Sequence, residues 1–258
     1  ARYWRRKINP LVISITGSNG KTTVKEMLGR ILSSQAATLV TPGNFNNDIG
    51  VPLTLFKLSE QDRYAVIEMG ANHAQEIRNL VAIAEPDVVY VNNAQAAHLQ
   101  GFGSLQGVAQ AKGEMYQYCS SDAIAVFNLD EAFCDYWMSI ASAKKWLRFS
   151  SQHPADVSAE GILSAEGITL QLSYQQHQYA CTLKVYGEHN VQNALAAITL
   201  AIACGITPSL CCHALEGFAG VIGRQQLVSG INNSLLIDDS YNANPDSLKA
   251  AIKVLCAL

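Results

Sequence analysis

The hydrophobic pattern near the start of the chain indicates a buried strand followed by an amphipathic helix. Residues 11–15, LVISI, form a continuous apolar and β-branched run, which is typical of a strand covered on both faces. A loop of small residues follows, and after it apolar side chains recur at helical spacing, at Val24, Met27 and Ile31 among others. This order predicts a strand, a glycine loop and a helix.

Further apolar runs predict strands of the same kind at residues 64–70, 87–93 and 123–130. Helical patterns separate them at 73–83 and 105–118. Strands that alternate with helices predict an α/β fold with a mostly parallel sheet and helices on both of its faces.

The pattern changes in the second half of the chain. Residues 155–186 alternate between apolar and polar side chains around a polar turn, which predicts a small antiparallel β region with one wet face. A helix is expected at 190–205, with Gly205 as its C-cap, and a glycine-punctuated junction at 220–226.

A new strand at 234–240 and a helix at 244–255 follow this junction. One strand and one helix cannot bury a core of their own. We therefore expect that a second domain begins here and that the chain is cut within it.

Composition and charge argue against several function classes. A net charge of -3 over 258 residues disfavours the cationic surface of nonspecific nucleic-acid binding, so no nucleic-acid partner is expected. The basic cluster Arg5, Arg6 and Lys7 is interpreted as a solvated terminus rather than a nucleic-acid arm.

Seven cysteines without Cys-x-x-Cys spacing indicate neither a disulfide framework nor a zinc site, and they fit a reducing cytoplasm. The longest apolar run, 194–204, is too short for a bilayer, so no membrane association is expected.

The loop in SITGSNGKTTVKEM, residues 14–27, has the chemistry of a phosphate cradle. Glycines let backbone amides converge on an anion, and the following helix presents its positive end. Lys21 is placed to bridge terminal phosphates, and Thr22 to offer a hydroxyl to magnesium. Ile15 stands where the phosphate-loop pattern expects its first glycine. The alternative is a glycine turn followed by a surface lysine.

Two residues are expected at the carboxyl edge of the parallel sheet, where ligands bind in such folds. Glu68 ends one predicted strand and is either a magnesium ligand or a solvated charge at the rim. His98 follows the next strand and is either a metal ligand or a structural or exposed histidine. Lys112 lies in a predicted helix, and from the residues alone it is most simply a solvated lysine.

Several motifs together resemble a known family. They are, in chain order, TGSNGKTT, IEMGANHAQEI, NNAQAAHLQGFGS, AKGE, GEHNVQNALAA, GRQQ and DDSYNANP. Their order is similar to that of the Mur ligase family, the ATP-dependent amide ligases of peptidoglycan precursor synthesis, over nearly the whole chain. The family uses the same Thr-Gly loop opening, which accounts for Ile15.

The resemblance implies a division of the chain into domains. Family proteins have an N-terminal domain for a UDP-sugar, a central ATPase and a C-terminal nucleotide-fold domain. By this comparison, residues 1–10 are a linker from a missing N-terminal domain, 11–222 are a P-loop NTPase-like central domain, and 223–258 begin a truncated C-terminal domain. Such a piece is expected not to complete ligation alone.

The resemblance also implies roles for individual residues. Lys21 would contact the outer phosphates, Thr22 and Glu68 one magnesium ion, and His98 a second. Lys112 matches the lysine that the family carbamylates with carbon dioxide, which converts a cation into an anionic ligand for the second ion. The implied ATP-binding residues are Thr16, Gly17, Ser18, Asn19, Gly20, Lys21, Thr22, Thr23, His189, Asn190, Asn193, Arg224, Asp239, Tyr241 and Asn242.

Ordinary structural roles remain open for part of this set. His189, Asn190 and Asn193 also fit a polar helix N-terminus. A plain turn with an Asx cap before Pro245 would equally account for Arg224, Asp239, Tyr241 and Asn242.

The stretches GNFNNDIGVPLTL and DDSYNANPDSLKAAI are similar to those of the members that add D-alanyl-D-alanine to UDP-N-acetylmuramoyl-tripeptide. Asn44, Asn46 and Asn47 would then contact the peptide-sugar substrate, although asparagine also suits loops for backbone reasons. The implied mechanism passes through an acyl phosphate, with ATP and two magnesium ions, in an enzyme expected to be a monomer. Three alternatives stay open: a sibling ligase, an enzyme like folylpolyglutamate synthase, and a P-loop nucleotide switch without ligase activity.

Overall fold

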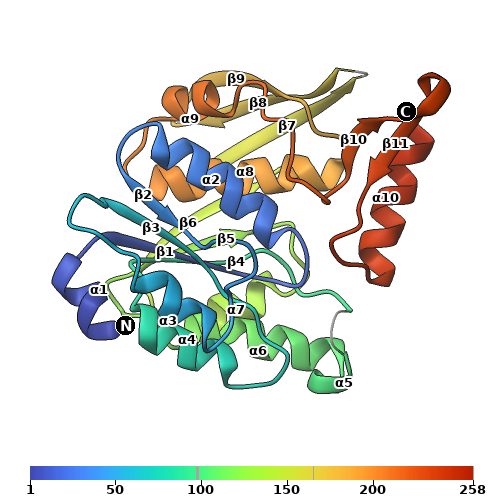
Figure 1. The fold of residues 1–258 in the computed structure, drawn as a ribbon. Helices are drawn as coiled ribbons and strands as arrows, with labels where there is room; N and C mark the ends of the chain where they lie inside the picture. The colour runs from blue at the N-terminus through green and yellow to red at the C-terminus, as the bar shows by residue number, and fades with distance from the viewer. Residues whose placement is uncertain (97–98, 165, 258) are drawn as a thin grey trace.

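A central sheet organises the molecule (Figure 1). The structure, a computed structural model, describes residues 1–96, 99–164 and 166–257. The sheet has nine strands in the order β2-β3-β1-β4-β5-β6-β7-β8-β9. Neighbours from β2 to β7 in this order run parallel, whereas β8 is antiparallel to both β7 and β9. The predicted α/β class, with a mostly parallel sheet and a small antiparallel region, is confirmed.

The strand bounds are β1 Leu11–Thr16, β2 Thr38–Val40, β3 Tyr64–Glu68, β4 Val88–Val91, β5 Ile124–Asn128, β6 Lys145–Ser150, β7 Val157–Ser164, β8 Gly167–Tyr174, β9 His177–Leu183, β10 Gln226–Ser229 and β11 Leu235–Asp238. The helix bounds are α1 Arg2–Ile8, α2 Lys21–Ser33, α3 Gly50–Leu55, α4 Glu76–Ala84, α5 Leu99–Phe102, α6 Leu105–Gln117, α7 Cys134–Ile140, α8 Glu188–Ala203, α9 Pro208–Leu215, the 3-10 turn η1 Ile231–Asn233 and α10 Pro245–Ala257. The predicted helices and strands all occur. The short elements that the pattern did not predict are α1, β2, α3, α5, β6, α7, α9, β10 and the 3-10 turn η1.

Helices cover both faces of the sheet (Figure 1). Because successive side chains of a strand point to opposite faces, the apolar run of β1 divides between two cores. Ile13 and Ile15 pack with α2, α8 and α9 on one face, and Val12 packs with α3, α4, α6 and α7 on the other. The continuous hydrophobicity of β1 therefore reflects burial on both sides.

The basic cluster near the N-terminus is only partly solvated, contrary to the sequence interpretation. Residues 2–8 form α1, and Arg5 is 6% exposed. Its guanidinium donates to the carbonyl oxygens of Ala84 and Glu85 at 3.1 and 2.8 Å and to the carboxylate of Asp87 at 2.8 Å. The carbonyl oxygens at the C-terminal end of α4 have no partner within the helix, and by accepting hydrogen bonds from Arg5 they keep its side chain buried. Arg6 stays exposed, as expected.

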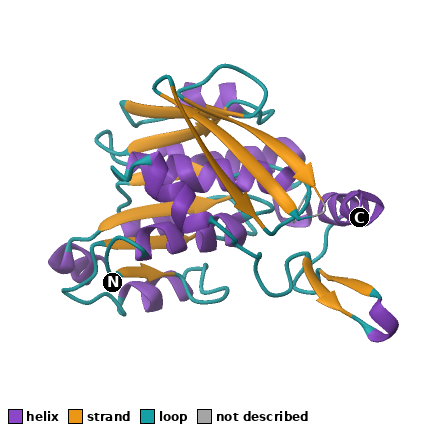
Figure 2. Ribbon diagram, turned by 90° about the horizontal axis from the view of Figure 1, so that it is seen from above, coloured by secondary structure: helices purple, strands orange, loops and turns teal. Residues whose placement is uncertain are grey.

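The C-terminal segment forms a small unit beside the large sheet. β10 and β11 pair antiparallel as a separate two-stranded ribbon, and α10 follows (Figure 2). Val254 of α10 is 3% exposed and lies close to Gly187 at the start of α8. The assignment of residues 223–258 to a further domain stays a prediction. None of the helices within the described ranges has the length and apolar character that a membrane span requires.

Candidate active site

The loop between β1 and α2 has the shape that its glycines predict. Gly20 has φ +77°, and a Cβ at this position would collide with the side chains of Asn92 and Asn193. Only glycine therefore gives both the turn and the close approach. Lys21 opens α2 and folds back over the loop, where its Nζ donates to the carbonyl oxygens of Gly17 at 2.8 Å and Ser18 at 3.1 Å. Burial lowers the pKa of Lys21; the negative charge of Glu68 opposes this shift, and the positive charge of Arg224 adds to it.

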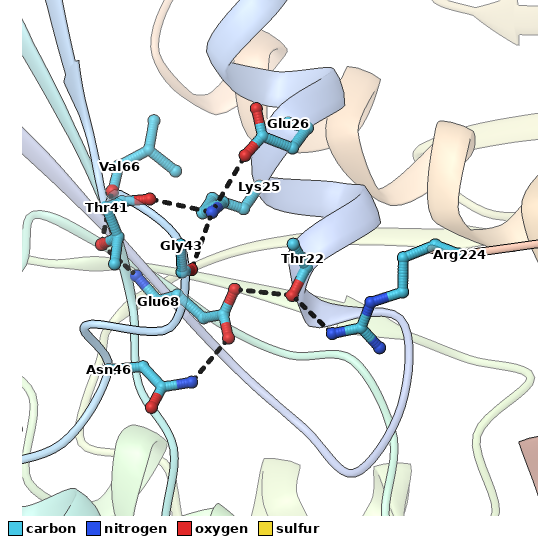
Figure 3. Close-up of polar contacts among 9 residues, drawn as sticks. All are labelled: Thr22, Lys25, Glu26, Thr41, Gly43, Asn46, Val66, Glu68 and Arg224. Carbon is cyan, nitrogen blue, oxygen red and sulfur yellow. Dashed lines mark hydrogen bonds and ion pairs between the residues drawn. The ribbon is translucent and has the colours of Figure 1, made fainter. Parts of the chain in front are cut away.

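A carboxylate from β3, which lies beside β1 in the sheet, contacts the start of α2 (Figure 3). Glu68 ends β3 and is 2% exposed. Its Oε2 accepts a hydrogen bond from Thr22 Oγ1 at 3.0 Å, and its Oε1 accepts one from Asn46 Nδ2 at 2.8 Å. Arg224 reaches the same point, since one of its terminal guanidinium nitrogens lies 3.1 Å from Thr22 Oγ1. The predicted meeting of Thr22 and Glu68 is therefore present.

Lys112 is buried, so the simple interpretation as a solvated helix lysine is wrong. Its side chain is 3% exposed on the inner face of α6. The Nζ atom lies 3.4 Å from the carbonyl oxygen of Ala71 and 5.6 Å from the ring centroid of Phe102. Desolvation, assisted by the positive charge of Lys21, lowers the pKa of Lys112 to about 7. A large share of this amine is therefore neutral near pH 7.

The N-terminus of α8 adds a group of amides on another side of the loop. Asn193 donates from its amide to Asn190 Oδ1 at 3.0 Å and accepts from Asn92 at 3.3 Å, while Asn92 also donates to the carbonyl oxygen of Asn19 at 2.7 Å. Burial lowers the pKa of the neighbouring His189, although Asp239 opposes the shift. These side chains tie α8 to the phosphate loop.

Side chains of the C-terminal segment complete the site. The Arg224 guanidinium carbon lies 3.9 Å from the ring centroid of Tyr241, in the geometry of a cation–π contact. Asn244, which the sequence did not single out, donates to Asn19 Oδ1 at 2.6 Å. Asp239 and Asn242 lie along the same wall.

The residues predicted for the site line one cleft of about 820 Å³, with two exceptions. Thr16 does not line it, because its buried hydroxyl donates to the carbonyl oxygen of Met69 at 2.7 Å. His98 lies outside the described residues. In the asparagine-rich loop, Asn47 also accepts from the backbone N–H groups of Ile49 and Gly50, so part of its role is to begin α3.

The cleft also contains polar residues that sequence reasoning missed. Asn92 and Asn93 follow β4, and Asn93 Oδ1 accepts from the backbone N–H groups of Ser18 and Asn19 at 3.1 and 2.9 Å. The rule that placed Glu68 at the sheet edge applies equally to both asparagines, so a signal for them was present.

A second missed group follows β5. Asp130 accepts hydrogen bonds from Gln192 Nε2 at 2.7 Å, from the backbone and hydroxyl of Ser151, and from Ser150. Burial raises the pKa of the adjacent Glu131 to about 7. Both carboxylates lie in the cleft, and their strand-end position was the available signal.

A family comparison agrees with this geometry. The model of the Mur ligase middle domain matches residues 15–201, which is most of the chain. The chain belongs to the Mur ligase family.

Two curated relatives from within this family are similar to nearly the whole chain. The chain is 46% identical over 260 residues to a UDP-N-acetylmuramoyl-tripeptide–D-alanyl-D-alanine ligase of Haemophilus influenzae, covering 99% of this chain and 56% of the relative. It is 42% identical over 260 residues to the enzyme of that name from Escherichia coli, covering 100% of this chain and 58% of the relative. The chain thus spans a little over half the length of these relatives.

Solved structures match the whole chain as well. A crystal structure of MurF from Acinetobacter baumannii superposes with a TM-score of 0.94 at 39% identity, over 100% of this chain and 56% of that one. A MurF ligase from Thermotoga maritima in complex with ADP gives a TM-score of 0.85 at 25% identity, over 99% of this chain and 59% of that one.

Proposed function

We propose that this chain is the ATP-binding part of an amide ligase that joins D-alanyl-D-alanine to UDP-N-acetylmuramoyl-tripeptide through an acyl phosphate. One observation carries the proposal: the phosphate loop, the Thr22–Glu68 pair and the buried Lys112 line a single cleft. The names of the relatives supply the substrates, and the ADP complex of the Thermotoga maritima protein supports an adenine nucleotide. The expected compartment is the cytoplasm, which suits the free cysteines of the described residues.

The phosphate side of the cleft suits a triphosphate with magnesium. Lys21 is placed to exchange its bonds to loop carbonyls for bonds to the outer phosphates. The Thr22 hydroxyl and a Glu68 carboxylate oxygen, 3.0 Å apart, are hard oxygen donors of the kind that magnesium prefers. No group of three or more His, Cys, Asp or Glu side chains converges among the described residues. This fits a magnesium ion that takes most of its other ligands from phosphates and water. When bound, it neutralises charge on the transferring phosphoryl group.

Lys112 is proposed to hold a second magnesium ion as a carbamate, with His98 as a further ligand. The neutral amine is the nucleophile toward carbon dioxide, and burial makes this form abundant near pH 7. The reaction joins nitrogen to the carbon of carbon dioxide and releases one proton. The product is an anion, which replaces a cation at this side of the cleft.

The nucleoside is proposed to lie between α8 and the C-terminal segment. His189 is half-buried, and desolvation lowers the pKa of its ring, so the neutral form that prevails at pH 7 can stack or hydrogen-bond without repelling a cation. Asn190 and Asn193 offer amide groups to the base. Arg224 and Tyr241 would close over the nucleotide from the opposite wall, together with Asp239 and Asn242.

The proposed chemistry needs no protein nucleophile. A carboxylate oxygen of the tripeptide attacks the γ-phosphorus of ATP, and the bond to the bridging oxygen breaks to release ADP. The amine of D-alanyl-D-alanine then attacks the acyl carbon, which releases phosphate and a proton. Lys21 stabilises the negative charge on the transferring group. Asn44 and Asn47 are proposed to orient the peptide-sugar, while Asn46 holds Glu68.

The test is product formation by the longer protein that contains this chain. It is incubated with ATP, magnesium, UDP-N-acetylmuramoyl-tripeptide and D-alanyl-D-alanine, and the products are identified by mass spectrometry. The expected result is a UDP-N-acetylmuramoyl-pentapeptide formed with an equal amount of ADP. A different amide product would indicate a sibling ligase, and ATP hydrolysis with no amide product would favour a nucleotide switch.

A further inference from the structure

One fully buried lysine lies outside the proposed chemistry. Lys25 is on α2, one turn after Lys21, and its side chain is 0% exposed. Its Nζ donates to the carbonyl oxygen of Thr41 at 2.8 Å and to that of Gly43 at 3.4 Å, and it pairs with the carboxylate of Glu26 at 3.0 Å. A buried ammonium group is costly unless such partners satisfy it, so these contacts hold the segment from Thr41 to Gly43 firmly against α2.

The segment that Lys25 holds is also bonded to the end of β3. The backbone N–H and the hydroxyl of Thr41 both lie within hydrogen-bond distance of the carbonyl oxygen of Val66, at 3.0 and 3.2 Å. The same hydroxyl accepts the backbone N–H of Glu68 at 3.0 Å. The position of Thr41 therefore fixes the backbone from which the Glu68 carboxylate projects.

The chain then turns at Gly43 and brings Asn46 to the other side of Glu68. Asn46 donates from its side chain to Glu68 Oε1, and its carbonyl oxygen accepts the N–H of Gly70 at 2.8 Å. With Oε1 occupied in this way, Oε2 is the oxygen that meets Thr22. Figure 3 shows these contacts closing a ring that begins and ends on α2, because Thr22 and Lys25 belong to the same helix.

We infer that Lys25 is a positioning residue, which sets the carboxylate of Glu68 against the hydroxyl of Thr22 and so determines the magnesium affinity of the nucleotide site. The inference rests on the proposed function, because it requires that nucleotide and magnesium bind here. Lys25 does not line the cleft among the residues that the structure describes, and it acts through the Thr41–Gly43 segment. Residues that orient metal ligands in this way typically change metal affinity by about 10- to 100-fold when they are removed.

The experiment measures binding of a non-hydrolysable ATP analogue to the longer protein that contains this chain, by calorimetry over a range of magnesium concentrations. Lys25→Met keeps the length of the side chain and removes its charge and its donors. Lys144→Met makes the same change at an exposed position and is the matched control. We expect Lys25→Met to raise the half-saturating magnesium concentration about tenfold or more. Affinity without magnesium should stay within about twofold of the original, and Lys144→Met should behave as the unsubstituted protein.

A second variant keeps the inference testable if Lys25→Met does not fold. Thr41→Val preserves the β-branched shape and removes only the hydroxyl that accepts the Glu68 N–H. It should shift the magnesium requirement in the same direction. In the Lys25→Met/Asn46→Ala double variant, the increase should be smaller than the product of the two single increases, because both act through one carboxylate.

The outcomes separate the inference from the function on which it rests. If the unsubstituted longer protein binds the nucleotide and folded Lys25→Met needs the same magnesium concentration, the inference is overturned and Lys25 serves stability alone. An unchanged magnesium requirement in Thr41→Val overturns it equally when Lys25→Met does not fold. If the unsubstituted longer protein binds no nucleotide at any magnesium concentration, the proposed function itself is overturned.

Discussion

Lys112 gives the sharpest prediction about the proposed second metal ion, because its reactivity depends on a measurable protonation state. Burial and the charge of Lys21 lower its pKa to about 7 from the ordinary 10.5. Below this pKa the ammonium form dominates, and above it the neutral amine does. At pH 8 about 90% of Lys112 is neutral, against about 0.3% of an ordinary lysine. At pH 6 the neutral share of Lys112 falls to about 10%.

The assay is carbon-13 NMR of the chain with labelled bicarbonate, at a constant concentration of dissolved carbon dioxide. We expect a carbamate resonance at pH 8 that weakens by more than tenfold at pH 6, because protonation removes the nucleophile and acid also reverses the addition. Lys112→Met should lose this resonance. The N-terminal amine supplies an internal comparison, because its carbamate should persist in the variant.

Two results would contradict this reasoning. If no resonance at pH 8 depends on Lys112, the buried amine does not react with carbon dioxide, and the proposed second metal site loses its anionic ligand. If the resonance keeps its full intensity to pH 6, contacts that stabilise the carbamate outweigh both protonation of Lys112 and acid reversal, and the pKa of about 7 does not control carbamate formation.

Two further predictions concern other basic residues. Lys21→Ala should abolish ATP binding in calorimetry while the far-ultraviolet circular dichroism stays unchanged, because its Nζ contacts the loop from the cleft side and supports no core; unchanged affinity in the folded variant would contradict this. Arg5→Met should lower the free energy of unfolding by about 2 to 3 kcal/mol in urea titrations, since it leaves two carbonyls and the Asp87 carboxylate without their charged donor. Arg6→Met, which removes only a solvent-exposed ion pair with Glu85, should change it by less than about 1 kcal/mol; equal effects of the two would show that burial of Arg5 adds nothing.

The sheet could be predicted from the sequence because its strands carry their burial in their own residues. β1 is apolar at successive positions, and the two cores on either side of Ile13 and Val12 explain why. β6 was missed because its first four residues are exposed or half-buried, among them Lys145 and Arg148. A strand with so little burial at one end has no continuous apolar run to reveal it.

Site residues that belong to a local motif could be predicted from the sequence. Residues whose surroundings come from distant segments of the chain could not. The glycine loop alone predicts the position of Lys21. By contrast, nothing near Lys112 in the sequence indicates its burial, which comes from packing of α6 beside residues 71 and 102. The same holds for Arg5, whose carbonyl partners lie about 80 residues away in the chain.

The cleft is lined by the basic residues Lys21, Lys112 and Arg224 and by the deeply buried carboxylate Glu68. The two lysines offset the cost of a buried charge in different ways. Lys21 donates to loop carbonyls, whereas the pKa of Lys112 falls to about 7, so that about half of this amine is neutral at pH 7. A triphosphate would favour the charged form of both, because its negative charge offsets their mutual repulsion. Carbon dioxide therefore has its best access to a neutral Lys112 before the nucleotide binds. The carbamate would make that position anionic, and an anionic oxygen there would hold a metal ion more favourably than the neutral amine does.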